Sequence, residues 1–249
     1  MSKDKIYFKN REEAAYKLLE ILPIDSMKPE EWTVIACSYG GFEIAKIVAD
    51  SLDAEFDIMF NEKIYAPQND ECEIAVVTEL EEVLIHEELV KAFDINLDSI
   101  YIMSKEIYKD NIRPIAYRFR NGEKFQNLAG KNVLIVDEDI NVGLVMMACI
   151  KTIINQKVKS ISVATPILST ASIKAIDSIT DDLYYIKSLD HFIEAEYYYE
   201  TLEELTYEDI NRIKNEGKEN YLSRPSHGGF KGPYLFTEEA SIDSIDRKS

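Results

Sequence analysis

The sequence predicts an α/β protein: an open, doubly wound, mostly parallel sheet with helices on both faces. Strand-like apolar runs alternate with helical segments, at residues 32–39, 56–60, 72–79, 131–138, 160–168 and 182–189. These runs are continuously apolar, which is typical of strands buried on both faces. Sheets of this kind bind ligands beyond the carboxyl ends of their strands, so function is expected where the runs end.

Helices are predicted before and between the runs. Asn10 is a candidate N-cap, with Glu13 three residues later, for an amphipathic helix that Pro23 ends. Further helices are predicted within 42–52, 86–95, 97–119, 143–154 and 171–179. Pro114 lies inside the fourth of these six helices, which must therefore kink or break there.

The composition of the last 33 residues differs from that of the rest. Four of the nine glycines lie in the segment 217–249, with aromatic residues that follow no period. We therefore expect an α/β domain over residues 1–216 and a C-terminal tail over 217–249. The tail is predicted either to be disordered or to dock on the body or on a partner.

The net charge of −18 over 249 residues is the main compositional signal. So acidic a chain should not bind nucleic acid or anionic membrane surfaces. No signal-peptide pattern and no apolar run of about 20 residues is visible, which favours a cytoplasmic protein. The three cysteines are far apart and lack histidine neighbours, so neither a disulfide framework nor a zinc site is expected.

Three stretches at predicted strand ends could carry chemistry. In "ACSYGGFEIA" the residues Ser38–Gly41 precede a helix, where backbone N–H groups can approach an anion, although a Gly-Gly pair is often only a tight turn. Lys63 lies in a polar stretch after a strand, where a lysine is more often a surface residue than part of a site. Asp137, Glu138 and Asp139 end the clearest strand; such acids suit ribose hydroxyls or a divalent cation, or simply a strand end that meets water.

These stretches, taken in order, resemble the type I phosphoribosyltransferases, in particular a bacterial branch of that family. "FKNREEAAYKLLEIL" fits the family's initial F-x-x-R-x-x-A helix, and "CSYGGFEIA" fits its P-R-G-G strand end. "EKIYAPQNDECEIAVVTE" fits R-K-[ILV]-x-x-P-x-[NH]-x-E. "NVLIVDEDINVGLVM" stands where the family has V-x-L-V-D-D-G-x-x-T-G-x-T. The resemblance spans about residues 7–215 and excludes the tail.

The resemblance implies a site for phosphoribosyl pyrophosphate with Mg²⁺ as cofactor. Asp137 and Glu138 would bind the ribose hydroxyls and the metal. The turn Asn141–Val145, which includes Val142, Gly143 and Leu144, would surround the 5′-phosphate. The loop Ser38, Tyr39, Gly40 and Gly41 would contact the pyrophosphate, and Lys63 would approach it. A homodimer is also implied, and the ligand would be a phosphorylated ribose or nucleotide-like molecule.

This sequence departs from the family at the phosphate-binding positions. Val142 and Val145 replace the two threonines of T-G-x-T, Leu144 replaces a small residue, and Tyr39 replaces the arginine of P-R-G-G. Each lost hydroxyl or charged contact is worth about 1–3 kcal/mol. Three such losses would weaken a phosphoribosyl pyrophosphate site by about two to five orders of magnitude.

Two functions therefore remain open. The first is transfer of a phosphoribosyl group to a nucleobase or related acceptor, which the whole-chain resemblance favours. The second is a non-catalytic nucleotide sensor, regulatory subunit or assembly protein, which the apolar turn, Tyr39 and the aromatic tail favour. The residues themselves favour the second, and nothing in the sequence names the acceptor. A Rossmann-type oxidoreductase is not supported, because no G-x-G-x-x-G follows a strand.

Overall fold

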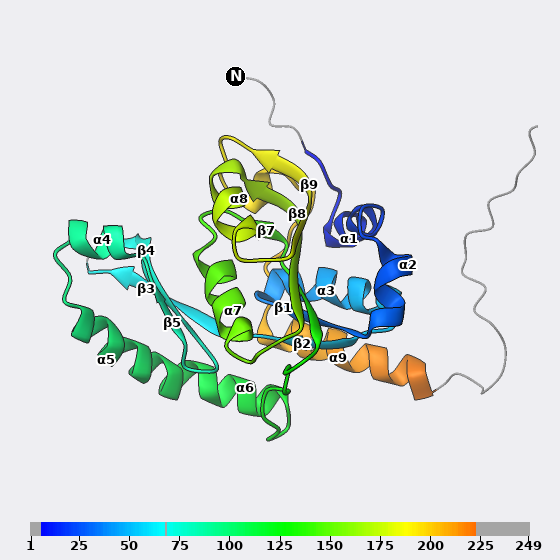
Figure 1. Ribbon diagram of the computed structural model, residues 1–249, viewed down its shortest axis with the longest axis horizontal. Helices are drawn as coiled ribbons and strands as arrows, with labels where there is room; N and C mark the ends of the chain where they lie inside the picture. The colour runs from blue at the N-terminus through cyan, green and yellow to red at the C-terminus, as the bar shows by residue number, and fades with distance from the viewer. Residues whose placement is uncertain (1–5, 68, 223–249) are drawn as a thin grey trace, which may run out of the picture.

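The computed structural model describes residues 6–67 and 69–222 (Figure 1). The helices are α1 Arg11–Leu19, α2 Ile24–Met27, α3 Tyr39–Leu52, α4 Glu87–Ala92, α5 Leu97–Ile107, α6 Arg113–Phe119, α7 Leu144–Ile154, α8 Thr170–Asp177 and α9 Tyr207–Leu222, with the short helices η1 Lys28–Glu30, η2 Tyr108–Ile112 and η3 Ala195–Tyr197. The strands are β1 Trp32–Ala36, β2 Glu55–Ile58, β3 Asn61–Ala66, β4 Asn69–Thr78, β5 Val83–Ile85, β6 Asn132–Val136, β7 Asp139–Ile140, β8 Ser160–Ser169 and β9 Asp182–Leu189.

The central sheet is parallel throughout, which confirms the predicted fold class. Its strands follow the order β2-β1-β6-β8-β7, and β9 also pairs with β8. β1 and β6 are paired up to Ala36 and Val136, the last residue of each strand. The loops that follow these two strands therefore begin side by side, and this register positions the site.

Helices cover both faces of the central sheet (Figure 1). On one face α1 and α3 pack through Ala14, Leu18 and Val48 against alternate strand residues such as Val34. On the other face α7 packs through Cys149 and Ile153 and α8 through Ile176, against strand residues of the opposite orientation. Because helices cover both faces of the sheet, side chains on both sides of each strand are buried, which is why these strands are continuously apolar.

The prediction that residues 72–79 belong to the parallel sheet is wrong. They lie in β4, which pairs antiparallel with β3 and β5 in a separate three-stranded sheet. β3 was not predicted as a strand, because Lys63 was placed in a polar stretch after one. In β3, Ile64 and Ala66 are buried while Lys63 and Tyr65 are exposed. That alternation is typical of a sheet with one solvated face. β3, β4, β5, α4 and α5 form a projection that we call the arm (Figure 1).

The helical stretch from residue 97 to 119 changes from α-helix to π-helix before Pro114, where a kink or a break was predicted. α5 passes into the π-helical segment η2, and α6 then begins at Arg113 with Pro114 in its first turn. Proline has no backbone N–H to donate, and the first turn of a helix is where a missing N–H costs the least stability. The end of α6 brings Arg120 into the space between the ends of β2 and β4.

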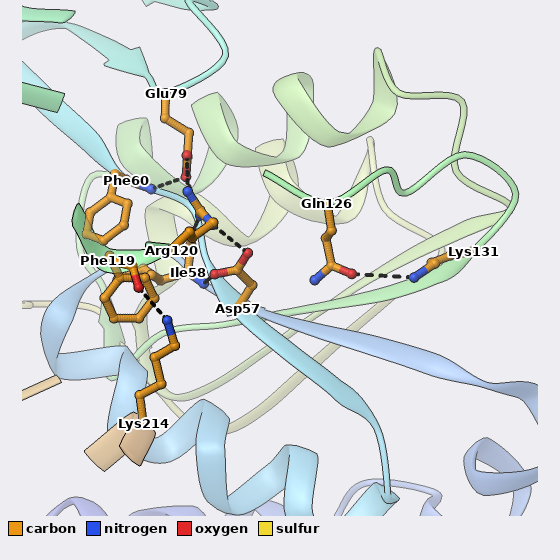
Figure 2. Close-up of polar contacts among 9 residues, drawn as sticks. All are labelled: Asp57, Ile58, Phe60, Glu79, Phe119, Arg120, Gln126, Lys131 and Lys214. Atoms are coloured by element: carbon orange, nitrogen blue, oxygen red, sulfur yellow. Dashed lines mark hydrogen bonds and ion pairs between the residues drawn. The ribbon is translucent and has the colours of Figure 1, made fainter. Parts of the chain in front are cut away.

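Arg120 anchors the arm to the central domain (Figure 2). Its guanidinium donates to Asp57 at 2.8 Å, to Glu79 at 2.6 and 2.9 Å, and to the Ile58 carbonyl at 2.6 Å. The side chains of Arg120, Asp57 and Glu79 are 7, 12 and 4% exposed. A second buried contact joins Thr78 of β4 to Thr152 of α7, with 3.0 Å between their hydroxyl oxygens.

The N-terminal segment pairs with a segment nearly 200 residues later. Phe8 forms a parallel bridge with Tyr199, and their ring centroids lie 5.1 Å apart. α9 runs to Leu222, past the domain boundary placed at residue 216. The rest of the predicted tail, 223–249, lies outside the described residues, so its docking stays a prediction. In the described ranges 6–67 and 69–222, no helix is both long and apolar enough to cross a bilayer.

Candidate functional site

A cavity of about 860 Å³ lies at the carboxyl ends of β1, β2 and β6. The β1–α3 loop, β3, the 137–146 segment, residues of η2 and α6, and the 192–205 segment line it. Of the residues predicted for the site, Ser38, Tyr39, Gly40, Lys63, Asp137, Glu138, Asn141, Val142, Gly143, Leu144 and Val145 all line the cavity. Gly41 is not among the lining residues.

Ser38 joins the β1–α3 loop to the acidic strand end. Its Oγ accepts a hydrogen bond from the Gly41 N–H at 2.8 Å, which caps α3, and its O–H donates to Oδ1 of Asp137. Gly41 is required here, because a Cβ would lie 2.8 Å from the Cα of Asp137. Burial raises the pKa of Asp137 to about 6, although the hydrogen bond from Ser38 opposes the shift.

Glu138 is held by Arg11, which the sequence analysis had not placed in the site. Nε of Arg11 lies 2.6 Å from Oε2 of Glu138, and Nη1 donates to the Glu203 carbonyl at 2.7 Å. The two side chains are 7 and 16% exposed. The Tyr199 hydroxyl donates to the Glu138 carbonyl at 3.0 Å. The Glu138 carboxylate covers Gly40 so closely that a Cβ there would lie 1.9 Å from Oε1.

Asp139, in β7, is the third acid of the run and is half-buried in the cavity wall. Burial raises its pKa to about 8, and the charges of Asp137 and Glu138 add to the shift, while Lys63 opposes it. Nζ of Lys63 lies 2.5 Å from Oε1 of Glu73 in the arm. Burial lowers the pKa of Lys63, but the hydrogen bond and charge of Glu73 outweigh it and the net shift is upward.

The turn 141–145 keeps a glycine-led helix start despite its apolar side chains. Gly143 has φ of +82° and precedes α7 as its N-cap, with no side-chain hydrogen bond to the helix. The first N–H groups of a helix have no partner within it and carry partial positive charge, so they can receive an anion. Val142 is 57% exposed, whereas Val145 packs against the apolar core around α7.

Acidic side chains outnumber basic ones around the cavity. Its acids are Glu62, Glu73, Asp137, Glu138, Asp139, Glu194, Glu196 and Glu204, and among the described lining residues its only basic side chains are Arg11 and Lys63. Each of these two cations is paired with a carboxylate. Recognition of an anionic ligand therefore depends on backbone N–H groups, on a divalent cation, or on release of one of these pairs.

Sequence reasoning missed Arg11 and the 192–205 lining. Arg11 stands in the F-x-x-R-x-x-A pattern, which was used as a sign of the family and not of the site. The acids Glu194, Glu196 and Glu204 lie in a segment without periodicity, so no local pattern could have indicated that they line the cavity.

A parallel sheet whose strand-end loops form one cavity places the protein in the open α/β class, in which ligands bind at this edge of the sheet. Residues 5–201 match the family model "Phosphoribosyl transferase domain", and the chain belongs to this family.

Solved structures are similar to the chain over most of its length. TT1426 from Thermus thermophilus is 23% identical, with a TM-score of 0.69 over 85% of this chain and 99% of that one. A purine phosphoribosyltransferase from Pyrococcus horikoshii is 15% identical, with a TM-score of 0.45 over 82% of this chain and 97% of that one. The likeness to TT1426 supports the fold.

Proposed function

We propose that the protein binds phosphoribosyl pyrophosphate in the strand-end cavity and transfers its phosphoribosyl group to an acceptor, with a weak hold on the phosphates. One observation carries the proposal: the uncapped start of α7 at Gly143 and the acidic end of β6 face the same cavity. A site for a phosphorylated sugar needs this combination of N–H groups for phosphate and carboxylates for hydroxyls.

Different residues of the cavity would bind different parts of the ligand. The first N–H groups of α7 would bind the 5′-phosphate, because no side chain competes for them. Asp137 and Asp139 would accept hydrogen bonds from ribose hydroxyls. The backbone from Ser38 to Gly40 would meet the pyrophosphate. A volume of about 860 Å³ is in the range of pockets that enclose ligands of this size.

Magnesium fits this site as an ion that arrives with the substrate. In the described part of the chain, no group of three or more His, Cys, Asp and Glu side chains is arranged to hold a metal. Mg²⁺ typically keeps several waters and takes one or two carboxylates plus phosphate oxygens. Asp137 and Asp139 can supply those carboxylates, and the ion would neutralise charge on the leaving pyrophosphate.

Catalysis would then consist of positioning and charge neutralisation. Pyrophosphate leaves C1′ of a sugar with oxocarbenium character, and the residues hold the two ends of the substrate apart. Val142 and Val145 offer no hydroxyl to the phosphate, which is why its affinity is expected to be low.

A non-catalytic sensor or regulatory protein is the second candidate. The observation that favours it is that Arg11 and Lys63, the two described cations of the cavity, are already paired with Glu138 and Glu73. With those pairs intact the pyrophosphate meets no free cation, and a ligand could bind without leaving-group activation.

Calorimetric titration with phosphoribosyl pyrophosphate and Mg²⁺ tests the proposal. Binding with a Kd between about 100 μM and a few millimolar supports the proposal, a Kd below about 100 μM would show that the phosphate site is not weakened, and no binding at millimolar ligand contradicts the proposal. Asp137→Asn should weaken binding, whereas Asp50→Asn, the same change on the exposed side of α3, should not. Release of pyrophosphate with a panel of nucleobases then separates the transferase from the second candidate.

A further inference from the structure

The Arg11–Glu138 ion pair occupies the place where the β1–α3 loop would meet a diphosphate. The Glu138 carboxylate covers Gly40, with both oxygens and the carboxyl carbon within 2.3 Å of an ideal Cβ position there. Gly40 therefore makes room for an internal carboxylate. An anionic group already lies against the loop to which the proposed function assigns the pyrophosphate.

The position of Arg11 suits it to bind an anion beside the β1–α3 loop. It is only 6% exposed, it begins α1 next to the N-cap Asn10, and its Nη1 is fixed by the Glu203 carbonyl at 2.7 Å. A guanidinium carries five N–H donors in a rigid fork. Nη2 makes no hydrogen bond to any part of the chain that the structure describes, so the fork keeps spare donors beside the cavity.

The second cation of the cavity is arranged differently. Lys63 is paired with Glu73 across the arm, and its side chain is 41% exposed, against 7% for that of Arg11. A charge-assisted bond is stronger where water is excluded, so Arg11 is the stronger anion-binding group of the two. Arg11 is also the one whose partner covers the glycine loop.

We propose that Arg11 is a diphosphate-binding residue and that Glu138 occupies its subsite in the free protein, as a carboxylate that the diphosphate must displace. This role rests on the proposed function for the identity of the ligand. This role is the opposite of the one that the resemblance gives to Glu138. A residue that binds ribose hydroxyls strengthens substrate binding, whereas a carboxylate that competes for Arg11 weakens it.

The two roles of Glu138 predict opposite effects of the same substitution. Glu138→Gln removes the competing charge, so the affinity for magnesium pyrophosphate should rise about tenfold, the effect of one charge-assisted contact. Glu196→Gln is the matched control: it removes one charge from the same cavity wall, and its carboxylate acts on Glu138 only through space. The control should raise affinity by less than half as much.

Arg11 is tested in the Glu138→Gln background, where its removal leaves no buried carboxylate unpaired. The double variant Arg11→Gln/Glu138→Gln should lose the gain and bind pyrophosphate at least tenfold more weakly than Glu138→Gln. Arg11→Lys/Glu138→Gln, which keeps the charge but not the fork, should fall between the two. Circular dichroism and the thermal midpoint of each variant show whether it is folded, and the comparison is made among folded variants.

The titrations use magnesium pyrophosphate with the full chain. Weaker binding by Glu138→Gln than by wild type overturns the proposal, as does an effect equal to that of Glu196→Gln or an Arg11 variant that keeps the gain. Ribose 5-phosphate is titrated in parallel and reports on the proposed function. If ribose 5-phosphate does not bind while the pyrophosphate affinities of the variants follow the predicted order, the proposed function is wrong and the role of Arg11 is supported.

Discussion

Arg120 donates to both carboxylate oxygens of Glu79, at 2.6 and 2.9 Å, and its Nε donates to Asp57. This is a bidentate pair in a buried position, at the junction of the arm and the central sheet (Figure 2). Burial raises the pKa of Glu79 even though the hydrogen bonds and charge of Arg120 oppose the shift. The carboxylate therefore depends on its partner for its charge.

Removal of Arg120 should destabilise the fold strongly. Arg120→Met leaves two buried carboxylates without a cation and should lower the free energy of unfolding by about 3–5 kcal/mol. Lys131→Ala is the control, because it breaks an ion pair whose Glu55 partner is 65% exposed, and it should cost less than about 1 kcal/mol. Urea unfolding followed by circular dichroism measures both, and equal shifts in midpoint would contradict the anchoring role.

Alanine at the two glycines of the α3 start should have unequal effects. In Gly41→Ala the new Cβ would lie 2.8 Å from the Cα of Asp137 and 3.0 Å from the Val136 carbonyl, which are backbone atoms that cannot rotate away. We expect it to cost about 1–3 kcal/mol. In Gly40→Ala the new Cβ meets only the end of the Glu138 side chain, which can shift by rotation while it stays near Arg11, so this change should cost less stability. Thermal unfolding tests the order, and a larger loss for Gly40→Ala would refute it.

Restoring hydroxyls to the turn should strengthen phosphate binding. Val142→Thr/Val145→Thr is expected to raise the affinity for ribose 5-phosphate by up to about thirtyfold, through two hydroxyl contacts worth about 1 kcal/mol each. Val142 is exposed, so its change should alter stability by less than about 0.5 kcal/mol. Val145 packs against the core, and its change should cost about 1–2 kcal/mol. If the double variant binds no better than wild type by calorimetry, the turn is not the weak element.

Stability without ligand should fall as pH rises from about 4 to 8. The pKa of Asp137 is raised from 3.8 to about 6 and that of Asp139 from 3.8 to about 8, so in this range the folded chain binds more protons than the unfolded chain. The free energy of unfolding then decreases with pH, and the contribution is fully lost above about 8. Asp139→Asn should flatten this dependence. Urea midpoints at pH 5, 6.5 and 8.5 measure it, and an unchanged slope in the variant would count against the assignment.

Local signals predicted the central strands and, in the arm, β4, α4 and α5, but not β3, β5 or the separate antiparallel sheet. The runs that became β1, β6 and β8 are apolar on both faces, and burial on both faces is what such a run requires. β5 has only three residues, Val83–Ile85, and it forms a strand because it pairs with the edge of β4. No pattern of that length separates a strand from a loop.

Most residues of the cavity could be predicted from the sequence, but not which of its charged side chains pair with one another. Ser38, Gly143 and Asp137 were found because strand ends in a parallel sheet meet at one edge. The partners of the acids could not be found in this way: 127 positions separate Arg11 from Glu138, and the contact depends on how α1 packs. For the same reason the lining acids after Phe192 had no sequence signal.

The bridge between Phe8 and Tyr199 has a consequence for biosynthesis. Arg11 leaves the ribosome before its partners Glu138 and Glu203, which lie 127 and 192 residues later in the chain, and Phe8 leaves it before its bridge partner Tyr199. The sheet core can assemble earlier, since domains fold as their residues emerge. The cavity is therefore completed late, and nascent chains that stop before residue 199 lack both the bridge to Phe8 and the Glu203 carbonyl that fixes Arg11.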